Sequence, residues 1–440
     1  MSQDWASRRR FLTAVLGAST VGLSGCGSDD GGTETPAENG GTDTPTETAT
    51  ATAEPTPAGT PERTATPEPT APPTETAEPT ATPTATPGAS SFAAWPRFMR
   101  NNEHWGHHPD ARAPHGDVSV DWKREFDQDQ INATAVLADG TLYVGAGGAG
   151  DKDGSFHALD PVTGETTWSK DTDAPVTSAA AIDSGFAYVG VSNGTLYALK
   201  TSDGSEFWNY EISSAGNFTA PVVADGEVYV GGAGSRVYNF DGLDSTQKWN
   251  QSTYGAINAS PVLADGMVYA PSGDHDLYAI TTGGSVEWSK TLRASVNGVS
   301  HRKRRLYVTT EKALHRINTS GKSEWTASSG SGFAATPAVT ENRVFAGTRD
   351  GTLFAFDVSD GFERWRYTAP SNGVTAPPVV ADGTVYVGSR DGTVYAVDTE
   401  TGDPEWTFET GNNINDAAPV VAGGRVYIGS QDGTFYALSE

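Results

Sequence analysis

The sequence predicts an all-β fold, an eight-bladed β-propeller built from four-stranded antiparallel blades. A pattern of about forty residues recurs eight times from residue 132 onward, and each copy consists of short β-branched and aromatic runs separated by Asp-Gly, Asn-Gly or Thr-Gly. Tryptophans that end the copies are spaced 37 to 46 residues apart, which is the period of propeller blades. Apolar spacing typical of helices does not accompany this period, so a helical solenoid is not expected.

The repeat is clearest in the seventh copy, where residues 376–398 are APPVVADGTVYVGSRDGTVYAVD. Three short strands are separated there by two tight turns, and Thr401-Gly402 leads to a fourth strand that contains Trp406. Each copy therefore predicts four antiparallel strands. The copies begin near Asn132, Thr177, Thr219, Ala259, Asn297, Thr336, Ala376 and Ala417.

The two ends of the repeat region complement each other. The last copy stops at Glu440 without a tryptophan strand, whereas residues 118–126 (VSVDWKREF) form such a strand with no copy before it. We expect the segment around Trp122 to pair with that around Tyr436, so that residues 118–440 close a monomeric ring without exposed sheet edges. The eight tryptophans are Trp122, Trp168, Trp208, Trp249, Trp288, Trp325, Trp365 and Trp406.

Residues 1–26 have the features of an export signal. Arg8 and Arg9 precede a short apolar run, and Leu23-Ser24-Gly25-Cys26 follows it. These parts resemble a twin-arginine signal and a lipobox, which implies export, cleavage before Cys26 and lipidation of its sulfur. The apolar run is too short to span a bilayer. An extracytoplasmic protein attached to the membrane through Cys26 is therefore expected.

Two further segments separate the signal from the ring. Residues 27–91 are almost wholly Thr, Pro, Glu, Ala and Gly, a composition that predicts a disordered linker. Residues 92–117 form what we call the leading segment, directly before the first predicted strand.

The charge balance restricts the choice of partners. Lys and Arg total 29 against 55 Asp and Glu, which gives a formal net charge of −26. Such a surface repels phosphate backbones, so nucleic acid is not expected as a partner. The scarcity of lysine beside many acidic residues also suggests a halophilic source. Cys26 is the single cysteine, so the fold contains no internal disulfide.

The repeat resembles the quinoprotein-like propeller superfamily, also called PQQ-like repeats. The resemblance depends on Ala396-Val397-Asp398, Thr401-Gly402 and Trp406, and on Trp95-Pro96-Arg97-Phe98 just upstream of the ring. It implies that each repeat tryptophan packs on the neighbouring blade. The fifth copy departs most, because His301-Arg302-Lys303-Arg304-Arg305 replaces the Ala-Asp-Gly turn.

Members of this superfamily include quinone-dependent dehydrogenases and BamB-type lipoproteins that bind proteins without catalysis. The resemblance to the dehydrogenases would imply a quinone held between a disulfide of adjacent cysteines and an extra tryptophan, with calcium nearby. Here Cys26 lies in the signal, and Trp95 and Trp105 lie outside the ring strands. We therefore expect a protein-binding or scaffolding module with no catalytic residue and no cofactor. A quinone-dependent oxidoreductase, a carbohydrate-active propeller and a structural envelope component are the alternatives.

Other charged clusters favour structural interpretations. His104, His107 and His108 have ligand chemistry for a transition metal, and residues 151–154 and 274–276 resemble pieces of calcium loops. Neither acidic piece has the full ligand spacing, so packing and turn formation are favoured and no metal is predicted. The basic run 302–305 is expected to be a degenerate turn, with docking of an acidic partner as the alternative.

A ligand or protein partner is expected on the propeller face where the links between blades gather. These links are rich in Asn, Gly and aromatic residues, which occur in recognition loops but also simply form turns. The candidate binding residues are Asn132, Asn217, Phe218, Tyr254, Asn258, Asn412, Asn413, Asn415 and Asp416. Asn132, Asn258 and Asp416 occupy equivalent positions before the first strand of a copy and are expected at the mouth of the channel.

Overall fold

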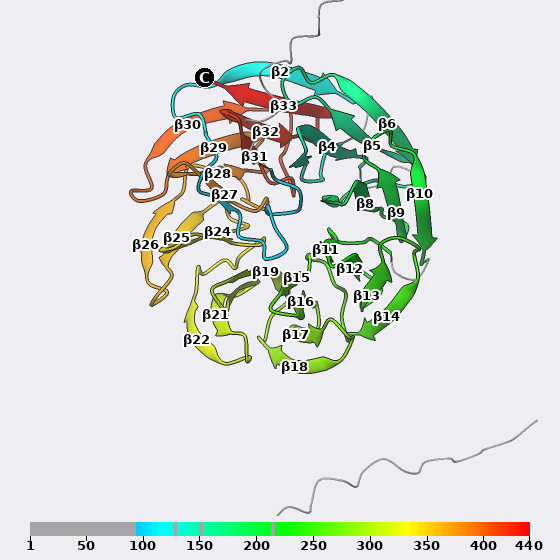
Figure 1. Ribbon diagram of the computed structural model, residues 1–440. Helices are drawn as coiled ribbons and strands as arrows, with labels where there is room; N and C mark the ends of the chain where they lie inside the picture. The colour runs from blue at the N-terminus through cyan, green and yellow to red at the C-terminus, as the bar shows by residue number, and fades with distance from the viewer. Residues whose placement is uncertain (1–93, 127–129, 149–152, 213–215) are drawn as a thin grey trace, which may run out of the picture. The chain divides into compact units, whose positions relative to one another are not determined.

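A computed structural model describes residues 94–126, 130–148, 153–212 and 216–440, all within one compact unit. They form eight antiparallel sheets arranged as the blades of a propeller, which confirms the predicted fold class (Figure 1). Within these ranges no helix could cross a membrane. The predicted signal with Arg8, Arg9 and Cys26, and the predicted linker, lie outside the described residues.

The blades follow one another in chain order. Blade 1 contains β3 (Val136–Ala138), β4 (Thr141–Ala146), β5 (Gly154–Leu159) and β6 (Thr166–Thr172), and blade 2 contains β7 (Ala181–Asp183), β8 (Phe186–Gly190), β9 (Thr195–Lys200) and β10 (Glu206–Glu211). Blade 3 contains β11 (Val222–Ala224), β12 (Glu227–Gly232), β13 (Arg236–Asp241) and β14 (Gln247–Ser252), and blade 4 contains β15 (Val262–Ala264), β16 (Met267–Pro271), β17 (Asp276–Thr281) and β18 (Val286–Thr291).

The second half repeats this order. Blade 5 contains β19 (Val296–Arg302), β20 (Arg305–Thr310), β21 (Leu314–Asn318) and β22 (Ser323–Ala327), and blade 6 contains β23 (Ala338–Val339), β24 (Arg343–Gly347), β25 (Leu353–Asp357) and β26 (Glu363–Tyr367). Blade 7 contains β27 (Val379–Ala381), β28 (Thr384–Gly388), β29 (Thr393–Asp398) and β30 (Pro404–Glu409), with β1 (His107–His108) added to β27. Blade 8 contains β31 (Val420–Ala422), β32 (Arg425–Gly429), β33 (Thr434–Ser439) and β2 (Ser119–Glu125).

Side-chain burial changes from the channel to the rim of each blade. Inner strands such as β28 are buried along their whole length, because neighbouring blades cover both of their faces. Outermost strands such as β6 alternate between exposed and less exposed residues, as expected for strands with one face in water. The first turn of a blade uses positive φ angles, for example 49° at Asp382 and 83° at Gly383, which suits a two-residue hairpin.

Strand β2 closes the ring. It pairs antiparallel with β33, so that Trp122 lies opposite Ala437 and Lys123 opposite Tyr436. A bulge between Val120 and Trp122 interrupts the register, and an irregularity at the corresponding place is present in the outermost strand pair of the other seven blades. The predicted pairing of the two ends is therefore confirmed, and the early strand occupies the place of a true fourth strand.

Each repeat tryptophan joins its blade to the next one. The indole N–H groups donate to backbone oxygens of Pro161, Thr201, Gly242, Thr282, Thr319, Val358, Thr399 and Pro114, in chain order of the tryptophans, at 2.8–3.1 Å. The last contact differs from the others, because Pro114 belongs to the leading segment rather than to blade 8. The leading segment thus supplies the hydrogen-bond acceptor that the turn between the third and fourth strands supplies in the other blades.

The leading segment crosses the channel and contacts every blade in turn (Figure 1). From Trp95 to Arg112 it exchanges hydrogen bonds with Leu137, Ile182, Val223, Leu263, His301, Val339, Val380 and Gly424, one residue from each of blades 1 to 8. Most of these partners lie one or two residues before the first turn of their blade. The segment therefore lies toward the end of the channel where those turns gather, opposite the links between blades.

Candidate functional site

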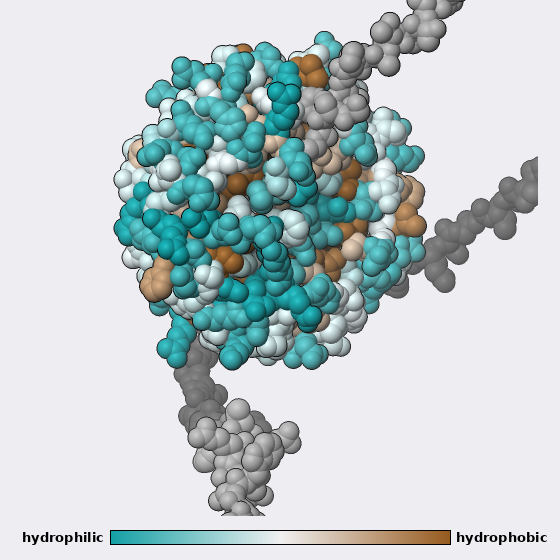
Figure 2. All heavy atoms as spheres, turned by 60° about the vertical axis from the view of Figure 1, so that its left-hand side comes forward, coloured by the Kyte–Doolittle hydropathy of each residue, from teal (hydrophilic) through white to brown (hydrophobic). Residues whose placement is uncertain are grey.

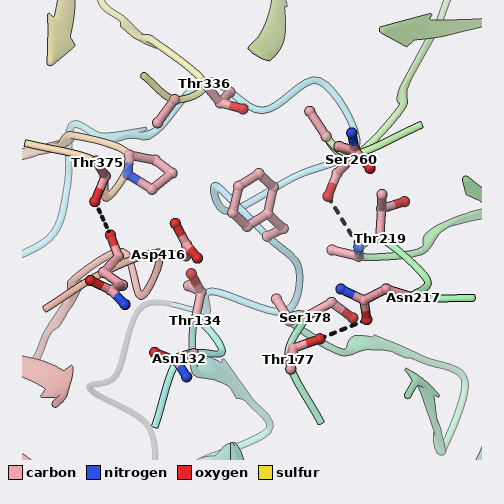
Figure 3. A pocket seen from close by; sticks show the side chains of 18 of the residues that line it. Asn132, Thr134, Thr177, Ser178, Asn217, Thr219, Ser260, Thr336, Thr375 and Asp416 are labelled. Atoms are coloured by element: carbon pink, nitrogen blue, oxygen red, sulfur yellow. Dashed lines mark hydrogen bonds between the residues drawn. The ribbon is translucent and has the colours of Figure 1, made fainter. Parts of the chain in front are cut away.

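A polar cavity of about 460 Å³ lies at the centre of the ring, where the links between blades meet. All eight blades contribute to its wall, mostly through residues just before their innermost strands (Figure 3). Phe98 of the leading segment also lines it. The polar lining residues are Gln130, Asn132, Thr134, Thr177, Ser178, Asn217, Thr219, Asn258, Ser260, Asn297, Thr336, Thr375, Asn415, Asp416 and Gln431.

Hydrogen bonds between neighbouring blades hold this wall in place. The Thr177 hydroxyl donates to the Asn217 side-chain oxygen at 2.8 Å, and the Thr375 hydroxyl donates to the Asn415 carbonyl at 2.7 Å (Figure 3). The hydroxyl of Ser260 accepts the Ala220 N–H at 3.1 Å. Because these contacts connect adjacent links, the side chains of Thr177, Asn217, Ser260 and Thr375 are held in place before any ligand arrives.

Asp416 is the one ionisable residue among the described residues that line the cavity. Its side chain is accessible to water but is surrounded by the cavity wall. This reduced solvation raises the pKa of the Asp416 carboxyl group, and the charge of Arg390 opposes the effect. Arg390 is itself bound elsewhere, since its Nε donates to the Asn415 side-chain oxygen at 3.1 Å.

The structure brings six of the nine candidate binding residues together. The six that line the cavity are Asn132, Asn217, Phe218, Asn258, Asn415 and Asp416. Asn412, Asn413 and Tyr254 lie on the same links but outside the cavity wall. Phe218 is buried at 1% exposure, so it supports the wall instead of offering a free aromatic face.

Tyr254 is the most exposed large hydrophobic side chain of the described residues, at 94%. Its backbone is nevertheless held firmly, because the Asp274 carboxylate accepts the Tyr254 N–H at 2.9 Å. The same carboxylate accepts the Asp276 N–H at 2.9 Å and the Tyr278 hydroxyl at 2.7 Å. Asp274 thus fixes a turn that displays an aromatic ring.

Comparison with known proteins identifies the family. The model of the family described as outer membrane protein assembly factor BamB matches residues 152–302, 294–376 and 365–440. The chain belongs to this family. Its curated relatives include the BamB proteins of Yersinia pestis, 28% identical over 38% of this chain and 46% of that protein, and of Nitrosomonas eutropha, 24% identical over 54% and 51%. The matches thus span about half the length of these relatives.

Quinoproteins are also similar to this BamB-family chain. The quinohemoprotein alcohol dehydrogenase of Comamonas testosteroni is 36% identical over 41% of this chain and 28% of that enzyme. Its crystal structure superposes with a TM-score of 0.66 at 15% identity, over 80% of this chain and 81% of that one. BamB from Moraxella catarrhalis superposes with a TM-score of 0.62 at 17% identity, over 73% and 100%. These structural matches establish the shared propeller fold.

The cavity does not fit a quinone cofactor. The described residues that line it include no tryptophan and no cysteine, and Asp416 is their single carboxylate. Trp95 and Trp105 belong instead to the leading segment, where Trp95 stacks on His108 and the Trp105 ring lies 4.5 Å from the Arg302 guanidinium.

The histidines of the leading segment are packing residues in this arrangement. His104 is completely buried and contacts Phe98 edge to face, and burial lowers its pKa to about 3. Burial likewise lowers the pKa values of His107 and His108 to about 4. In the part of the chain that the structure describes, no group of three His, Cys, Asp or Glu residues is arranged to hold a metal. Asp151 and Lys152 lie outside the described residues.

The basic run forms the first turn of blade 5, and most of its charge is paired. Arg302 donates to Glu341 at 2.5 Å, Lys303 also contacts Glu341, and Arg305 donates to Glu324 at 2.7 Å. Positive φ angles of 49° at Lys303 and 61° at Arg304 are those of a tight hairpin turn.

Sequence reasoning missed most of the cavity wall, because the candidates include six of its 24 described lining residues. Thr177 and Thr375 occupy the position of Asn132 in their blades, and Thr336 occupies that of Thr134, so alignment of the copies would have found all three. Phe98 carries no such signal, because the leading segment does not belong to the repeat.

Proposed function

We propose that this BamB-family chain is a membrane-anchored, extracytoplasmic protein-binding module whose partner binds the face formed by the links between blades. Lipidated Cys26 would provide the anchor, and residues 27–91 the tether. The observation that supports a binding role is the preorganised polar cavity, to which all eight blades contribute on that face. Family membership supports a protein partner, since the matching family is described as an outer membrane protein assembly factor.

Few large hydrophobic side chains are exposed on the described surface, and Tyr254 is the most exposed of them. On the face seen in Figure 2, hydrophobic residues form small separate patches among hydrophilic ones. Tyr254 lies on a link of the proposed binding face, and its ring is exposed on a backbone that Asp274 holds in place. A rigid exposed aromatic residue is a common anchor of protein interfaces, because burying it costs little conformational entropy.

Crosslinking on intact cells, followed by mass spectrometry, tests this proposal. The Tyr254→Ala variant is expected to lose a large part of the captured partner, about 10-fold in affinity if the ring is an anchor. Phe362→Ala is the matched control, because Phe362 is 68% exposed on an outer turn at the opposite end of its blade. Both substitutions should leave the thermal unfolding temperature unchanged, since neither side chain is buried.

The outcomes separate the alternatives. Equal capture by the wild-type protein and both variants would remove the link face from the binding site. If the wild-type protein captures no discrete partner, the protein-binding function fails and a structural role in the envelope becomes the better explanation.

A further inference from the structure

Among its described residues, the cavity wall is neutral except at one point. Its amide and hydroxyl side chains can donate or accept hydrogen bonds, but Asp416 alone adds charge. Blades 1 and 4 have Asn132 and Asn258 at the equivalent position, and both blades form without a carboxylate there. The fold of blade 8 therefore does not require the charge of Asp416.

The bonding of Asp416 differs from that of the structural aspartates near the same face. Asp274, Asp391 and Asp432 each accept hydrogen bonds from two backbone N–H groups and one tyrosine hydroxyl. Asp416 has no hydrogen bond and no ion pair with any described residue. The Asp416 carboxylate loses solvation inside the cavity, and the charge of Arg390 compensates for that loss only in part. A cation placed beside it would supply the remaining compensation.

We propose that the cavity receives a lysine side chain of the partner protein, with Asp416 as its counter-ion. An ammonium group has three donors, which suits one carboxylate together with neighbouring neutral oxygens. Asn258 is available for this role, because its side chain has no hydrogen bond with a described residue. A cavity of about 460 Å³ is large enough for a lysine side chain and the backbone that presents it.

The overall charge favours the same partner. A formal net charge of −26 attracts basic surfaces over long distances, and the effect weakens as salt is added. Long-range attraction and the local contact are separable, because only the local contact depends on Asp416 itself. This inference rests on the proposed protein-binding function, so its test must distinguish the failure of each.

A carbodiimide crosslinker provides that test, because it condenses a carboxylate with an amine to form an amide. Membranes carrying the full chain are treated with the reagent, and crosslinked peptides are identified by mass spectrometry. The expected product joins Asp416 to a lysine of the partner. It should be absent in Asp416→Asn and present in Asp403→Asn, a control that removes the same charge from an exposed outer turn.

A peptide titration tests the cavity independently of the natural partner. Acetyl-Gly-Gly-Lys-Gly-Gly-amide should bind the wild-type protein at least about 10-fold more tightly than the same peptide with norleucine, which lacks the charge. Asp416→Asn should abolish the difference, and Asp403→Asn should preserve it. Equal affinity for the two peptides, or a partner captured through link residues with no lysine joined to Asp416, would overturn the lysine inference and leave the binding function standing. Failure to capture any partner would contradict the binding function itself.

Discussion

The contribution of the contact between a repeat tryptophan and the next blade to the free energy of unfolding can be measured with a pair of glycine substitutions. Gly402 and Gly383 both lie in turns of blade 7, and their φ angles are positive, 79° and 83° respectively. A Cβ added at Gly402 would lie 2.8–3.0 Å from three ring atoms of Trp365, whereas a Cβ at Gly383 would meet nothing within 4 Å. The pair therefore differs in one feature, the packing of the tryptophan on the neighbouring blade.

The expected magnitudes follow from this geometry. Alanine at a left-handed position costs about 1–2 kcal/mol, and this cost is common to both variants. The Trp365 ring cannot move away freely, because it is 9% exposed and its N–H is bonded to the Thr399 oxygen at 3.1 Å. Overpacking of this kind costs about 1–3 kcal/mol. Gly402→Ala should therefore lower the free energy of unfolding by about 1–3 kcal/mol more than Gly383→Ala does.

Urea denaturation followed by tryptophan fluorescence and circular dichroism measures this difference. A double variant with Trp365→Phe should recover part of the loss, since the smaller ring leaves room for the added methyl group. Equal destabilisation by the two alanines would refute the argument that indole packing on the glycine joins the blades.

Two further predictions concern the parts of the chain outside the repeat. Because burial holds the pKa of His104 near 3, below its ordinary value of 6.5, the unfolded chain binds a proton more readily than the folded one. The contribution of His104 to the free energy of unfolding is complete above pH 6.5 and is lost as the pH falls toward 3. At pH 4.5 the loss is about 2–3 kcal/mol. His104→Asn, which does not titrate and tolerates the positive φ of 55°, should reduce the slope of the free energy of unfolding against pH between pH 6.5 and 4.5, and His107 and His108 account for part of the slope that remains. An unchanged slope would contradict this account. Cys26→Ser should move the protein from the membrane fraction to the soluble fraction of cells, because lipidation requires the cysteine sulfur, and continued sedimentation with membranes would count against the anchor.

The repeat made the architecture predictable. Each blade forms through hairpins between residues that are close in the chain. The Asp-Gly turns and the tryptophan spacing of each of the eight copies therefore predict the same blade structure. Even the closure of the ring followed from counting, because the unpaired strand around Trp122 and the incomplete last copy had only each other as partners.

The candidate site was predictable only where the repeat reaches it. Asn132, Asn258 and Asp416 could be placed at the channel mouth because they occupy equivalent positions in their copies. The sequence could not show that Asp416 lacks a partner while Asp274 has three, because both are single aspartates near turns. That distinction depends on which backbone N–H groups the neighbouring link brings within reach.

By itself, the sequence determined the number of blades, their strand order and the net charge, because these depend on local pattern and composition, and the resemblance to the propeller superfamily implied the tryptophan contacts between blades. Only the tertiary structure decided the course of the leading segment and the chemistry of the cavity. Asn102 bonds to Val223, which is 121 residues away, and its neighbours contact the remaining blades in turn. Contacts of this kind depend on where the closed ring places its channel, and no residue pattern in the segment encodes that position.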